Sequence, residues 1–569
     1  MRVQFSRRLP PLSALGVLLA VAGLHQSMAP TLLVRSWYFQ GVVTGVAVAL
    51  GYAIGALVQR VGGWLLRTGL RTWSRRTGRP LPTGPRTTTP ERTRQLELGF
   101  RVLVAVLVVL AVRQTVDQQR WTWERLDHEP GRGPVLLLGT ALLATAVVAL
   151  LVGFVLLVRL LVRRTTGLAD RVLPRWIAAG VAGVLVLWAV ASTLNTWVYQ
   201  RTLDGLNEAF TLSDGQVQDD LEPPTSTVRS AGPESRVVWE QAGREGRRFL
   251  TSGPTTEQIA AVHPQRRVAA EPVRVFVGRA QAEDAEERAE IALDELERFG
   301  AFEREVVLVV VPTGTGWVNE QAVQPLEYLF AGDVATVSMQ YSHLPSPLAF
   351  LTEARAAQDA GRALVGAVAE RIEALPAGER PRLLLAGESL GTFGAAGAFD
   401  SLDELLELPE ASLWIGAPSS VHLRTQAEEQ REPGSPQIRP VWRGGTQVLF
   451  ANRASDLTDE QVDGVRAVFL QQADDAIVWW DWPVAWERPD WLSEPLDPAV
   501  NPDMRWYPVT TFLNLAVDMA VATAFDEDQG HKYGTQPALA WRTMLDPAAW
   551  DEAAFAALVE ELEKIERTV

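Results

Sequence analysis

The sequence predicts two structural parts: membrane-spanning helices over residues 1–200, and a mainly parallel β-sheet with helices on both faces over residues 236–569. Three observations support this division. Five long apolar stretches lie within the first 200 residues. Residues 1–200 carry 23 Lys and Arg against 7 Asp and Glu, whereas residues 201–569 carry 30 against 61. From residue 272 onward, short apolar runs alternate with helical patterns, as in proteins with a parallel sheet.

The apolar stretches predict about five transmembrane helices, because a helix needs about 20 predominantly apolar residues to cross the hydrocarbon core. They are Leu12–Leu33, Gly41–Leu66, Leu98–Val116, Pro134–Val162 and Trp176–Tyr199. The first stretch has the alternative of a cleaved signal peptide. Its best cleavage position, after Ala29, is followed by Pro30 and by further apolar residues. We therefore expect a retained anchor.

The distribution of arginines predicts the orientation of these helices. Arginines concentrate before the first stretch, between the second and third, and between the fourth and fifth; they are Arg2, Arg7, Arg8, Arg67, Arg71, Arg75, Arg76, Arg79, Arg86, Arg92, Arg94, Arg163, Arg164, Arg171 and Arg175. Such segments face the cytoplasm. The loop near Arg120–Arg132 is balanced by Asp117, Glu124, Asp127 and Glu129 and can lie outside. The N-terminus is therefore expected in the cytoplasm and residues 201–569 outside it.

Composition excludes several classes of function for the second part. Residues 201–235 are polar and rich in Pro, Ser and Asp, and predict a juxtamembrane linker. The acidic balance of the remainder argues against nucleic acid binding, which requires a basic surface. The absence of cysteine excludes disulfides, thiol catalysis and zinc bound by cysteine. We expect neither a metal nor a cofactor.

Seven apolar runs predict the strands of the sheet. They are Val273–Val277, Val306–Val311, Asp333–Met339, Leu383–Ala386, Ser412–Ile415, Gln447–Ala451 and Val468–Gln471. Helical patterns separate some of them, at Gln281–Phe299 and Thr352–Leu375, and a further apolar helix is expected at Val509–Ala524. Alternation of buried strands with helices indicates a mainly parallel sheet covered on both faces.

The run Leu383–Ala386 leads into Gly387-Glu388-Ser389-Leu390-Gly391, and a helical pattern follows. Strand, G-x-S-x-G and helix are the arrangement of a nucleophile elbow in an α/β-hydrolase. There the serine occupies a strained turn, and the flanking glycines avoid collisions with neighbouring backbone. The alternative is a Gly/Ser turn without chemistry. The pattern makes Ser389 the candidate nucleophile.

A catalytic serine of this type needs a histidine and an acid, which follow it in that fold in the order serine, acid, histidine. Only His422 and His531 follow Ser389. His531 lies near the C-terminus, after a predicted helix, and is the preferred candidate. His422 comes early, soon after a predicted strand, and is the alternative. A surface histidine without a catalytic role is the competing interpretation of His531.

The acid is expected in a loop after a strand between Ser389 and His531. Asp475 follows the run Val468–Gln471 and is the preferred acid, with Asp474 and then Asp456 as alternatives. The acid orients the imidazole and stabilises its charged form without taking the proton. Each of these aspartates has the alternative role of a turn or helix N-cap residue.

The loop after Val306–Val311 contains Thr313, Gly314, Thr315 and Gly316. In α/β-hydrolases the oxyanion hole combines an amide of such a loop with the amide after the nucleophile, here Leu390. The glycines allow the backbone to approach a substrate oxygen. No G-K-[ST] follows, so a nucleotide-binding loop is not expected.

Several stretches together resemble an actinobacterial family of multi-pass membrane α/β-hydrolases, which combines an N-terminal membrane domain with a C-terminal catalytic domain. The stretches are Pro312–Asn319, Gly332–Ser346, Gly387–Gly394, Asp475–Trp480, Arg505–Pro508 and Gly530–Tyr533. The resemblance spans most of residues 236–545. It implies a serine hydrolase whose acid is Asp475 and whose histidine is His531. It does not imply a substrate.

Tryptophan is frequent between residues 479 and 506. The tryptophans are Trp479, Trp480, Trp482, Trp486, Trp491 and Trp506. Core packing is one interpretation. The other is an aromatic cap that faces the membrane interface and an acyl chain.

The expected function is that of a membrane-anchored, extracytoplasmic serine hydrolase resembling esterases and lipases. Ser389 would form an acyl-enzyme with a lipid or cell-envelope ester, in contact with the bilayer. An envelope acyltransferase with the same triad is an alternative, and so is a non-catalytic membrane scaffold with a hydrolase fold. The sequence predicts no oligomeric state.

Overall fold

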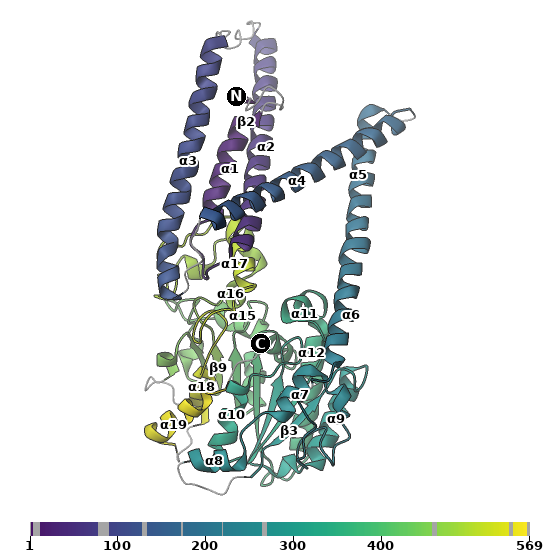
Figure 1. The fold of residues 1–569 in the computed structure, drawn as a ribbon, viewed down its shortest axis with the longest axis vertical. Helices are drawn as coiled ribbons and strands as arrows, with labels where there is room; N and C mark the ends of the chain where they lie inside the picture. Colours follow the sequence, from purple (N-terminus) through teal and green to yellow (C-terminus); the bar gives the residue numbers. More distant parts are fainter. Residues whose placement is uncertain are drawn as a thin grey trace. The chain divides into compact units, whose positions relative to one another are not determined.

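The computed structural model describes residues 2–3, 12–77, 90–127, 134–171, 174–218, 220–263, 270–457, 464–545 and 550–565. The chain forms two compact units (Figure 1). The first, here called the helical unit, combines Met1–Leu194 with Trp482–Val521. The second, the sheet unit, combines Asn195–Asp481 with Ala522–Val569. Arg7, Arg8, Arg79, Arg86 and Glu129, used above for the orientation, lie outside the described residues.

The N-terminal part of the helical unit consists of long helices. Their bounds are α1 Ala14–Ser27, α2 Trp37–Thr77, α3 Pro90–Arg125, α4 Pro134–Ala169 and α5 Arg175–Thr193, and β1 Arg2–Val3 pairs with β2 Leu12–Ser13. Within the described residues, four helices are long and apolar enough to cross a membrane: Trp37–Thr77, Glu91–Arg125, Leu137–Ala169 and Trp176–Thr193. The predicted apolar helical region is confirmed.

The first predicted span is shorter than expected. The stretch Leu12–Leu33 forms only the 14-residue helix α1. At a rise of about 1.5 Å per residue such a helix falls short of a hydrocarbon core about 30 Å thick. Pro30 explains the early end, because proline disfavours helical geometry in the residue before it. By length, the expected five spans are therefore reduced to four in the described chain.

Helix α1 nevertheless packs closely on α2 through glycines. A Cβ atom on Gly23 would lie 2.4 Å from Ala47 O, and one on Gly51 would lie 2.3 Å from Leu19 O. Small residues allow this approach of two backbones, as is common between membrane helices. At the two ends of the pair, Ser13 Oγ donates to Gln59 Oε1 at 2.5 Å and Ser27 Oγ donates to Thr44 Oγ1 at 3.0 Å.

The remaining part of the helical unit, Trp482–Val521, is called the insert below. It contains two short 3₁₀ segments, η6 Trp482–Ala485 and η7 Asp490–Leu492, and the helix α17 Thr510–Met519. The predicted helix Val509–Ala524 is thus present but shorter. In sequence the insert lies between Asp475 and His531.

The sheet unit contains a seven-stranded parallel sheet with the order β3-β5-β4-β6-β7-β9-β8. The strands are β3 Val273–Val277, β4 Val306–Val311, β5 Val334–Met339, β6 Arg382–Glu388, β7 Ala411–Ile415, β8 Val448–Ala451 and β9 Ala467–Leu470. All neighbouring strands pair in parallel. The predicted parallel sheet is confirmed, with each strand at or close to its predicted position.

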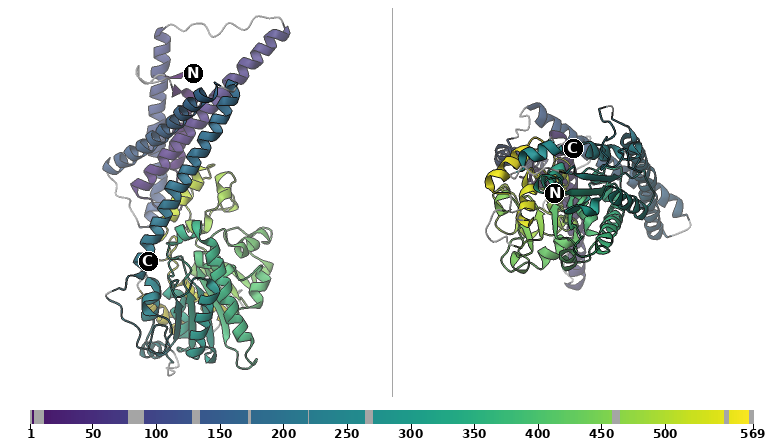
Figure 2. Two further views of the ribbon diagram at one scale, coloured as in Figure 1. Left: turned by 90° about the vertical axis from the view of Figure 1, so that its right-hand side faces the viewer. Right: turned by 90° about the horizontal axis from the view of Figure 1, so that it is seen from below.

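Helices cover both faces of this sheet, as Figure 2 shows from two further sides. The alternating residues of β4 explain why: Val307 and Val309 belong to one apolar cluster, and Leu308 and Val310 to the other. The first cluster includes residues of α9 Ala285–Arg298, α12 Ala354–Glu373, α13 Leu390–Ala396, α14 Leu402–Glu407 and α15 His422–Glu429. The second includes residues of α7 Gly243–Thr251, α8 Thr256–Val262, α10 Glu320–Leu329, α18 Gln536–Leu545 and α19 Glu552–Leu562.

The other helices of the sheet unit are short or peripheral. They are α6 Arg201–Gly215, α11 Ser346–Thr352, α16 Ala476–Trp479, the π-helix η1 Leu194–Gln200 and the 3₁₀ segments η2 Trp239–Gln241, η3 Ala301–Glu303, η4 Arg443–Gly445 and η5 Ala454–Leu457. Helix α6 forms within the polar segment 201–235 and ends beside Asp214. Part of this segment is therefore helical and bonded to the sheet unit, as described below.

Candidate active site

Ser389 occupies a strained turn between β6 and α13. Its φ of 53° and ψ of −123° lie outside the regions that a residue with a side chain normally adopts. Such strain persists only where the surrounding structure enforces it. Here the Ser389 amide donates to Ile415 O at 2.8 Å, and Ser389 O accepts from Thr392 Oγ1 at 2.6 Å. The turn has the backbone geometry expected of a nucleophile elbow.

The two glycines that flank Ser389 leave no room for a side chain. A Cβ atom on Gly391 would lie 2.2 Å from Val311 O, at the end of β4. One on Gly387 would lie 2.9 Å from the carbonyl carbon of Gly391. The first turn of α13 is therefore held against the carboxyl end of β4, where the predicted oxyanion loop begins.

Asp475 and His531 form a buried pair. Asp475 Oδ2 lies 2.6 Å from His531 Nδ1, and the exposed fractions of the two residues are 0% and 4%. The other carboxylate oxygen, Oδ1, accepts from the Ile477 amide at 2.9 Å and caps α16. Asp475 thus has both of the roles considered for it, partner of an imidazole and N-cap residue.

Gly416 connects the serine to this pair. It follows Ile415, whose carbonyl accepts the Ser389 amide. A Cβ atom on Gly416 would lie 2.3 Å from His531 Cε1 and 3.2 Å from Asp475 Oδ2. The imidazole therefore lies directly against the Gly416 backbone. Ser389, Asp475 and His531 gather where β6, β7 and β9 end, because parallel strands bring their carboxyl ends to one edge.

The structure separates the alternative residues from His531 or gives them other partners. Asp474 Oδ1 accepts from the Gly530 amide at 3.3 Å and supports the histidine loop. Asp456 follows the edge strand β8 and pairs with Arg439 at 2.5 Å. His422 Nε2 lies 2.9 Å from Phe399 O at the start of α15. Of the candidate acids, Asp475 is the one that contacts His531 in the described structure.

The predicted oxyanion loop is a tight turn that uses most of its own amides. Thr313 N donates to Trp317 O at 3.0 Å, Gly316 N donates to Thr313 O at 2.9 Å, and Gly314 N donates to Ser346 Oγ at 3.3 Å. Among the four loop amides, only that of Thr315 makes no hydrogen bond to the described residues. The candidate oxyanion donors are thereby narrowed to Thr315 and to Leu390 at the start of α13.

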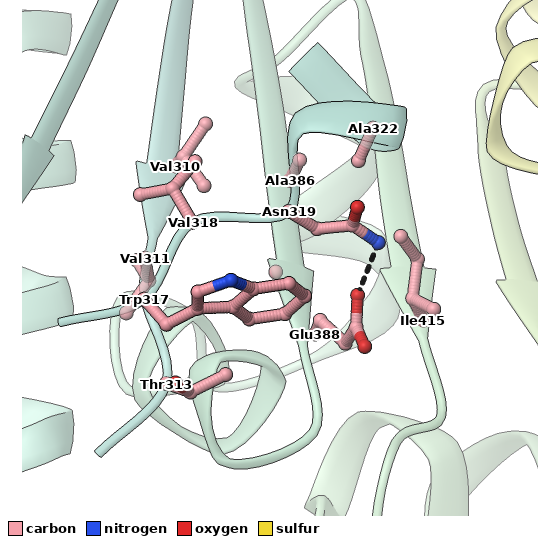
Figure 3. Close-up of a pocket in the computed structure, with 11 residues that line it drawn as sticks. Val310, Val311, Thr313, Trp317, Val318, Asn319, Ala322, Ala386, Glu388 and Ile415 are labelled. Atoms are coloured by element: carbon pink, nitrogen blue, oxygen red, sulfur yellow. Dashed lines mark hydrogen bonds between the residues drawn. The ribbon is translucent and has the colours of Figure 1, made fainter. Parts of the chain in front are cut away.

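A small cavity lies at the carboxyl ends of β4 and β6, next to this loop (Figure 3). Its walls are largely apolar and include Trp317 and Ile415. Within them, Asn319 Nδ2 donates to Glu388 Oε2 at 2.5 Å, and both residues are 5% exposed. Asn319 Oδ1 also accepts from the Gln321 amide at 2.9 Å and caps α10. One amide therefore ties the oxyanion loop and α10 to the residue before Ser389.

A second imidazole–carboxylate pair lies behind the loop. His343 Nδ1 is 2.8 Å from Asp214 Oδ2. Gln340 Nε2 donates both to that oxygen, at 3.1 Å, and to Thr315 O, at 2.9 Å. Burial favours the neutral form of Asp214, but hydrogen bonds from His343, the Arg244 amide and Gln340 outweigh it and lower the pKa of Asp214. The network fixes the loop from the side away from β6.

The sequence did not point to Asn319, Glu388 or Asp214 as contributors to the site. Glu388 occupies the variable second position of the pentapeptide, and Asp214 lies in the segment expected to be a linker. In the sequence, the only signal for these residues was a polar side chain close to residues expected to be buried. In the described part of the chain no group of three or more His, Asp or Glu side chains has the arrangement of a metal site.

The parallel sheet, the strained turn at Ser389 and the buried pair of Asp475 and His531 are the features of an α/β-hydrolase fold. Family comparison matches residues 273–558 to the α/β-hydrolase family, and residues 28–254 to the N-terminal region described for that family. The chain belongs to this α/β-hydrolase family. Comparisons with curated proteins and with solved structures found no match.

Proposed function

We propose that this protein is a membrane-anchored serine hydrolase that cleaves a carboxylic ester through an acyl-enzyme. The observation that carries the proposal is the buried contact of 2.6 Å between Asp475 and His531, beside the turn that strains Ser389. A serine, an orienting carboxylate and an imidazole, in this order along the chain, support nucleophilic catalysis.

The proposed reaction has two halves. The Ser389 oxygen attacks the ester carbonyl while His531 accepts the serine proton, and the resulting imidazolium is stabilised by Asp475. The tetrahedral intermediate collapses, the alcohol leaves with the proton from His531, and the acyl group stays on Ser389. Water then attacks the acyl-enzyme, gives its proton to His531, and releases the acid and free Ser389.

The oxyanion of each tetrahedral intermediate is proposed to bind the amides of Leu390 and Thr315. Leu390 N begins α13, and the first amides of a helix have no partner within it. The position of Thr315 is fixed by Gln340, whose side-chain amide donates to the Thr315 carbonyl. Fixed donors of this kind stabilise the developing negative charge without reorganisation.

The proposed location of the catalytic domain is outside the cytoplasm. Arginines are concentrated in two stretches, residues 67–94 around the connection from α2 to α3 and residues 159–175 around the connection from α4 to α5. If both face the cytoplasm, the chain leaves α5 on the outer side whether or not α1 counts as a span. Helix α1 begins at the level of Gln59 on α2, which supports a cytoplasmic N-terminus.

Labelling with a fluorophosphonate probe tests the nucleophile. The full chain in detergent is expected to react covalently, and Ser389→Ala to lose all labelling. Ser401→Ala is the control, because Ser401 only caps α14 through the Glu404 amide. Equal labelling of wild type and Ser389→Ala would falsify the mechanism, and no labelling of either would favour a non-catalytic scaffold.

Product analysis separates hydrolysis from acyl transfer. With purified envelope lipids, hydrolysis releases a free acid, whereas an acyltransferase moves the acyl group to a second hydroxyl. Water as the acceptor is expected. Accumulation of an acylated envelope product in place of free acid would replace the hydrolase by the acyltransferase with the same three residues.

The orientation has its own test, which exploits the absence of native cysteine. Glu379 is exposed in the sheet unit, before β6. In intact spheroplasts that produce Glu379→Cys, a membrane-impermeant maleimide is expected to label the protein. Labelling only after permeabilisation would place the domain in the cytoplasm and would exclude the proposed cell-envelope substrate.

A further inference from the structure

The insert is a long segment of the C-terminal half that packs with the N-terminal helices. Trp482–Val521 forms a compact unit with Met1–Leu194. In sequence it begins shortly after Asp475 and ends shortly before His531. Both proposed partners of Ser389 are therefore joined by short chain segments to a structure that belongs to the membrane part of the protein.

A buried ion pair attaches the insert to the connection between α1 and α2. Arg35 Nε lies 2.8 Å from Asp518 Oδ1, and the two side chains are 3% and 0% exposed. Asp518 Oδ2 accepts from the Leu32 amide at 3.1 Å, and the second branch of Arg35 donates to Asn514 Oδ1 at 2.9 Å. Three hydrogen bonds thus join α17 to this connection.

A second contact joins the insert to the end of α3. Asn501 Nδ2 donates to Thr122 Oγ1 at 2.8 Å and to Gln118 O at 3.0 Å. Both residues lie in the last turns of α3, beyond its apolar part. Two separate segments of the insert are therefore fixed to the N-terminal part of the helical unit, one to the connection between α1 and α2 and the other to α3.

Both attachment points lie at the same end of the helices. Arg35 lies two residues before α2, and Thr122 lies near the end of α3. The opposite ends of the same two helices, Thr77 and Pro90, are connected in sequence through residues 78–89, and the neighbouring Arg75, Arg76, Arg92 and Arg94 make this connection basic. The insert thus lies at the end of the bundle away from the basic connection, beside α1 and α2 in Figure 1.

The tryptophans of the insert fall into two groups. Trp491 is 3% exposed and buried in the insert, and the half-buried Trp506 donates from Nε1 to Val484 O at 2.9 Å. Trp482 and Trp486 are 59% and 65% exposed. Core packing therefore accounts for Trp491, whereas the exposure of Trp482 and Trp486 leaves the interpretation as an aromatic cap at the membrane interface open for these two residues.

The exposed pair has aromatic neighbours at the same end of the bundle. Trp37 and Tyr38, at the start of α2, are 41% and 48% exposed. Indole and phenol rings gather where the headgroups of a bilayer meet the hydrocarbon, because each has an apolar body and a polar tip. The Trp482 ring packs on Phe512 of α17, with ring centroids 5.3 Å apart, and is held on a fixed element.

We propose that the insert is an interfacial element whose Trp482 and Trp486 lie in the headgroup region of the outer leaflet. Since Asp475 and His531 flank the insert in the chain, we further assign the substrate as a lipid acyl ester of that leaflet. The assignment of substrate class rests on the proposed function, whereas the membrane contact of the insert does not.

Depth measurement tests the membrane contact. Single nitroxide labels are placed on Trp486→Cys, on Glu379→Cys as the solvent reference and on Leu110→Cys of α3 as the hydrocarbon reference. With the full chain in phosphatidylcholine vesicles, the label at 486 is expected to show oxygen and nickel-chelate accessibilities between those of the two references. Nickel accessibility equal to that at 379 overturns the proposal.

Two substrates test the assignment of the lipid ester. Trp482→Ala/Trp486→Ala is expected to lower hydrolysis of a long-chain ester embedded in vesicles by about tenfold, with little change for a soluble short-chain ester. Trp64→Ala is the control, because Trp64 is also 59% exposed but lies toward the basic end of α2. Equal losses on both substrates overturn the lipid assignment. Interfacial depth at 486 without any esterase activity or probe labelling refutes the proposed function and leaves the membrane contact standing.

Discussion

Tyr533 and His531 share one oxygen atom of Asp475. The Tyr533 hydroxyl donates to Asp475 Oδ2 at 2.7 Å, and His531 Nδ1 lies 2.6 Å from the same oxygen. Burial raises the pKa of the Tyr533 phenol well above its usual value, and the charge of Asp475 raises it further. Tyr533 is therefore a neutral donor at neutral pH, and it competes with His531 for the charge of the Asp475 carboxylate.

The change Tyr533→Phe is expected to lower kcat by about three- to tenfold while KM stays unchanged, because the carboxylate loses a hydrogen bond that orients it. The freed charge should also stabilise imidazolium more strongly, so the acid limb of the pH–rate profile moves to higher pH. Tyr341→Phe, a buried tyrosine at the end of β5, is the control. An unchanged pH profile would argue that Tyr533 has only a packing role.

Asp475→Asn tests the choice of acid. If Asp475 orients His531, ester hydrolysis should fall by about three to four orders of magnitude, as expected when a triad acid is neutralised. Asp456 pairs with Arg439 and accepts from the Asn452 amide, away from His531, so Asp456→Asn can cost stability but should leave the turnover of the folded protein within about twofold. Initial rates of both purified variants decide between them. Comparable losses would require a different assignment.

Gly416→Ala tests the position of the imidazole. The added methyl group would lie 2.3 Å from His531 Cε1, and the φ of +57° at Gly416 also disfavours a side chain. Since the elbow and the sheet are otherwise unchanged, kcat is expected to fall by about a hundredfold, as when a catalytic group is displaced by about 1 Å. Fluorophosphonate labelling rates measure the effect without substrate. A labelling rate equal to that of wild type would show that the ring moves freely.

The strands and the serine turn could be predicted because their signals are local. The apolar run Val306–Val311 is buried on both sides, and such runs indicate a central parallel strand. The turn at Ser389 is likewise indicated by five consecutive residues, although the distant Ile415 holds it in place. The order serine, acid, histidine restricted the other candidates to a few positions.

Contacts between segments that are distant in the sequence could not be predicted from local patterns. Arg35 and Asp518 are 483 positions apart, and nothing in either neighbourhood indicates the other. Composition also misjudged the polar segment around Asp214, because its hydrogen bonds with Gln340 and His343 depend on the tertiary fold. Pro30 could have predicted the early end of α1 from the sequence, but the apolar residues on both sides of it favoured a longer span.

The lowered pKa of Asp214 predicts a pH-dependent contribution to stability. A carboxyl group whose pKa is lower in the folded state stabilises the fold above its ordinary pKa of 3.8, and this contribution is lost as pH falls through the folded value. Asp214→Asn should therefore lower the stability at pH 7 by about 1–3 kcal/mol. Thermal unfolding of the full chain in detergent should show that the difference in stability between wild type and Asp214→Asn disappears below about pH 4. If the difference in stability does not depend on pH, the lower stability of Asp214→Asn results from altered packing and not from the lost charge.

The contact between Asn319 and Glu388 allows a rescue experiment. Asn319→Asp keeps the oxygen that caps α10 but turns the donor facing Glu388 into a second carboxylate oxygen. Two buried carboxylates in contact cannot both be charged, so a loss of about 2–4 kcal/mol in stability is expected, with lower kcat because the oxyanion loop separates from the elbow. Asn319→Asp/Glu388→Gln restores a donor and an acceptor in reversed order and should recover most of both losses. Glu388→Gln alone can still accept from Asn319 and should be mild. If the double variant is as impaired as Asn319→Asp, the hydrogen bond is not what holds the loop to the residue before Ser389.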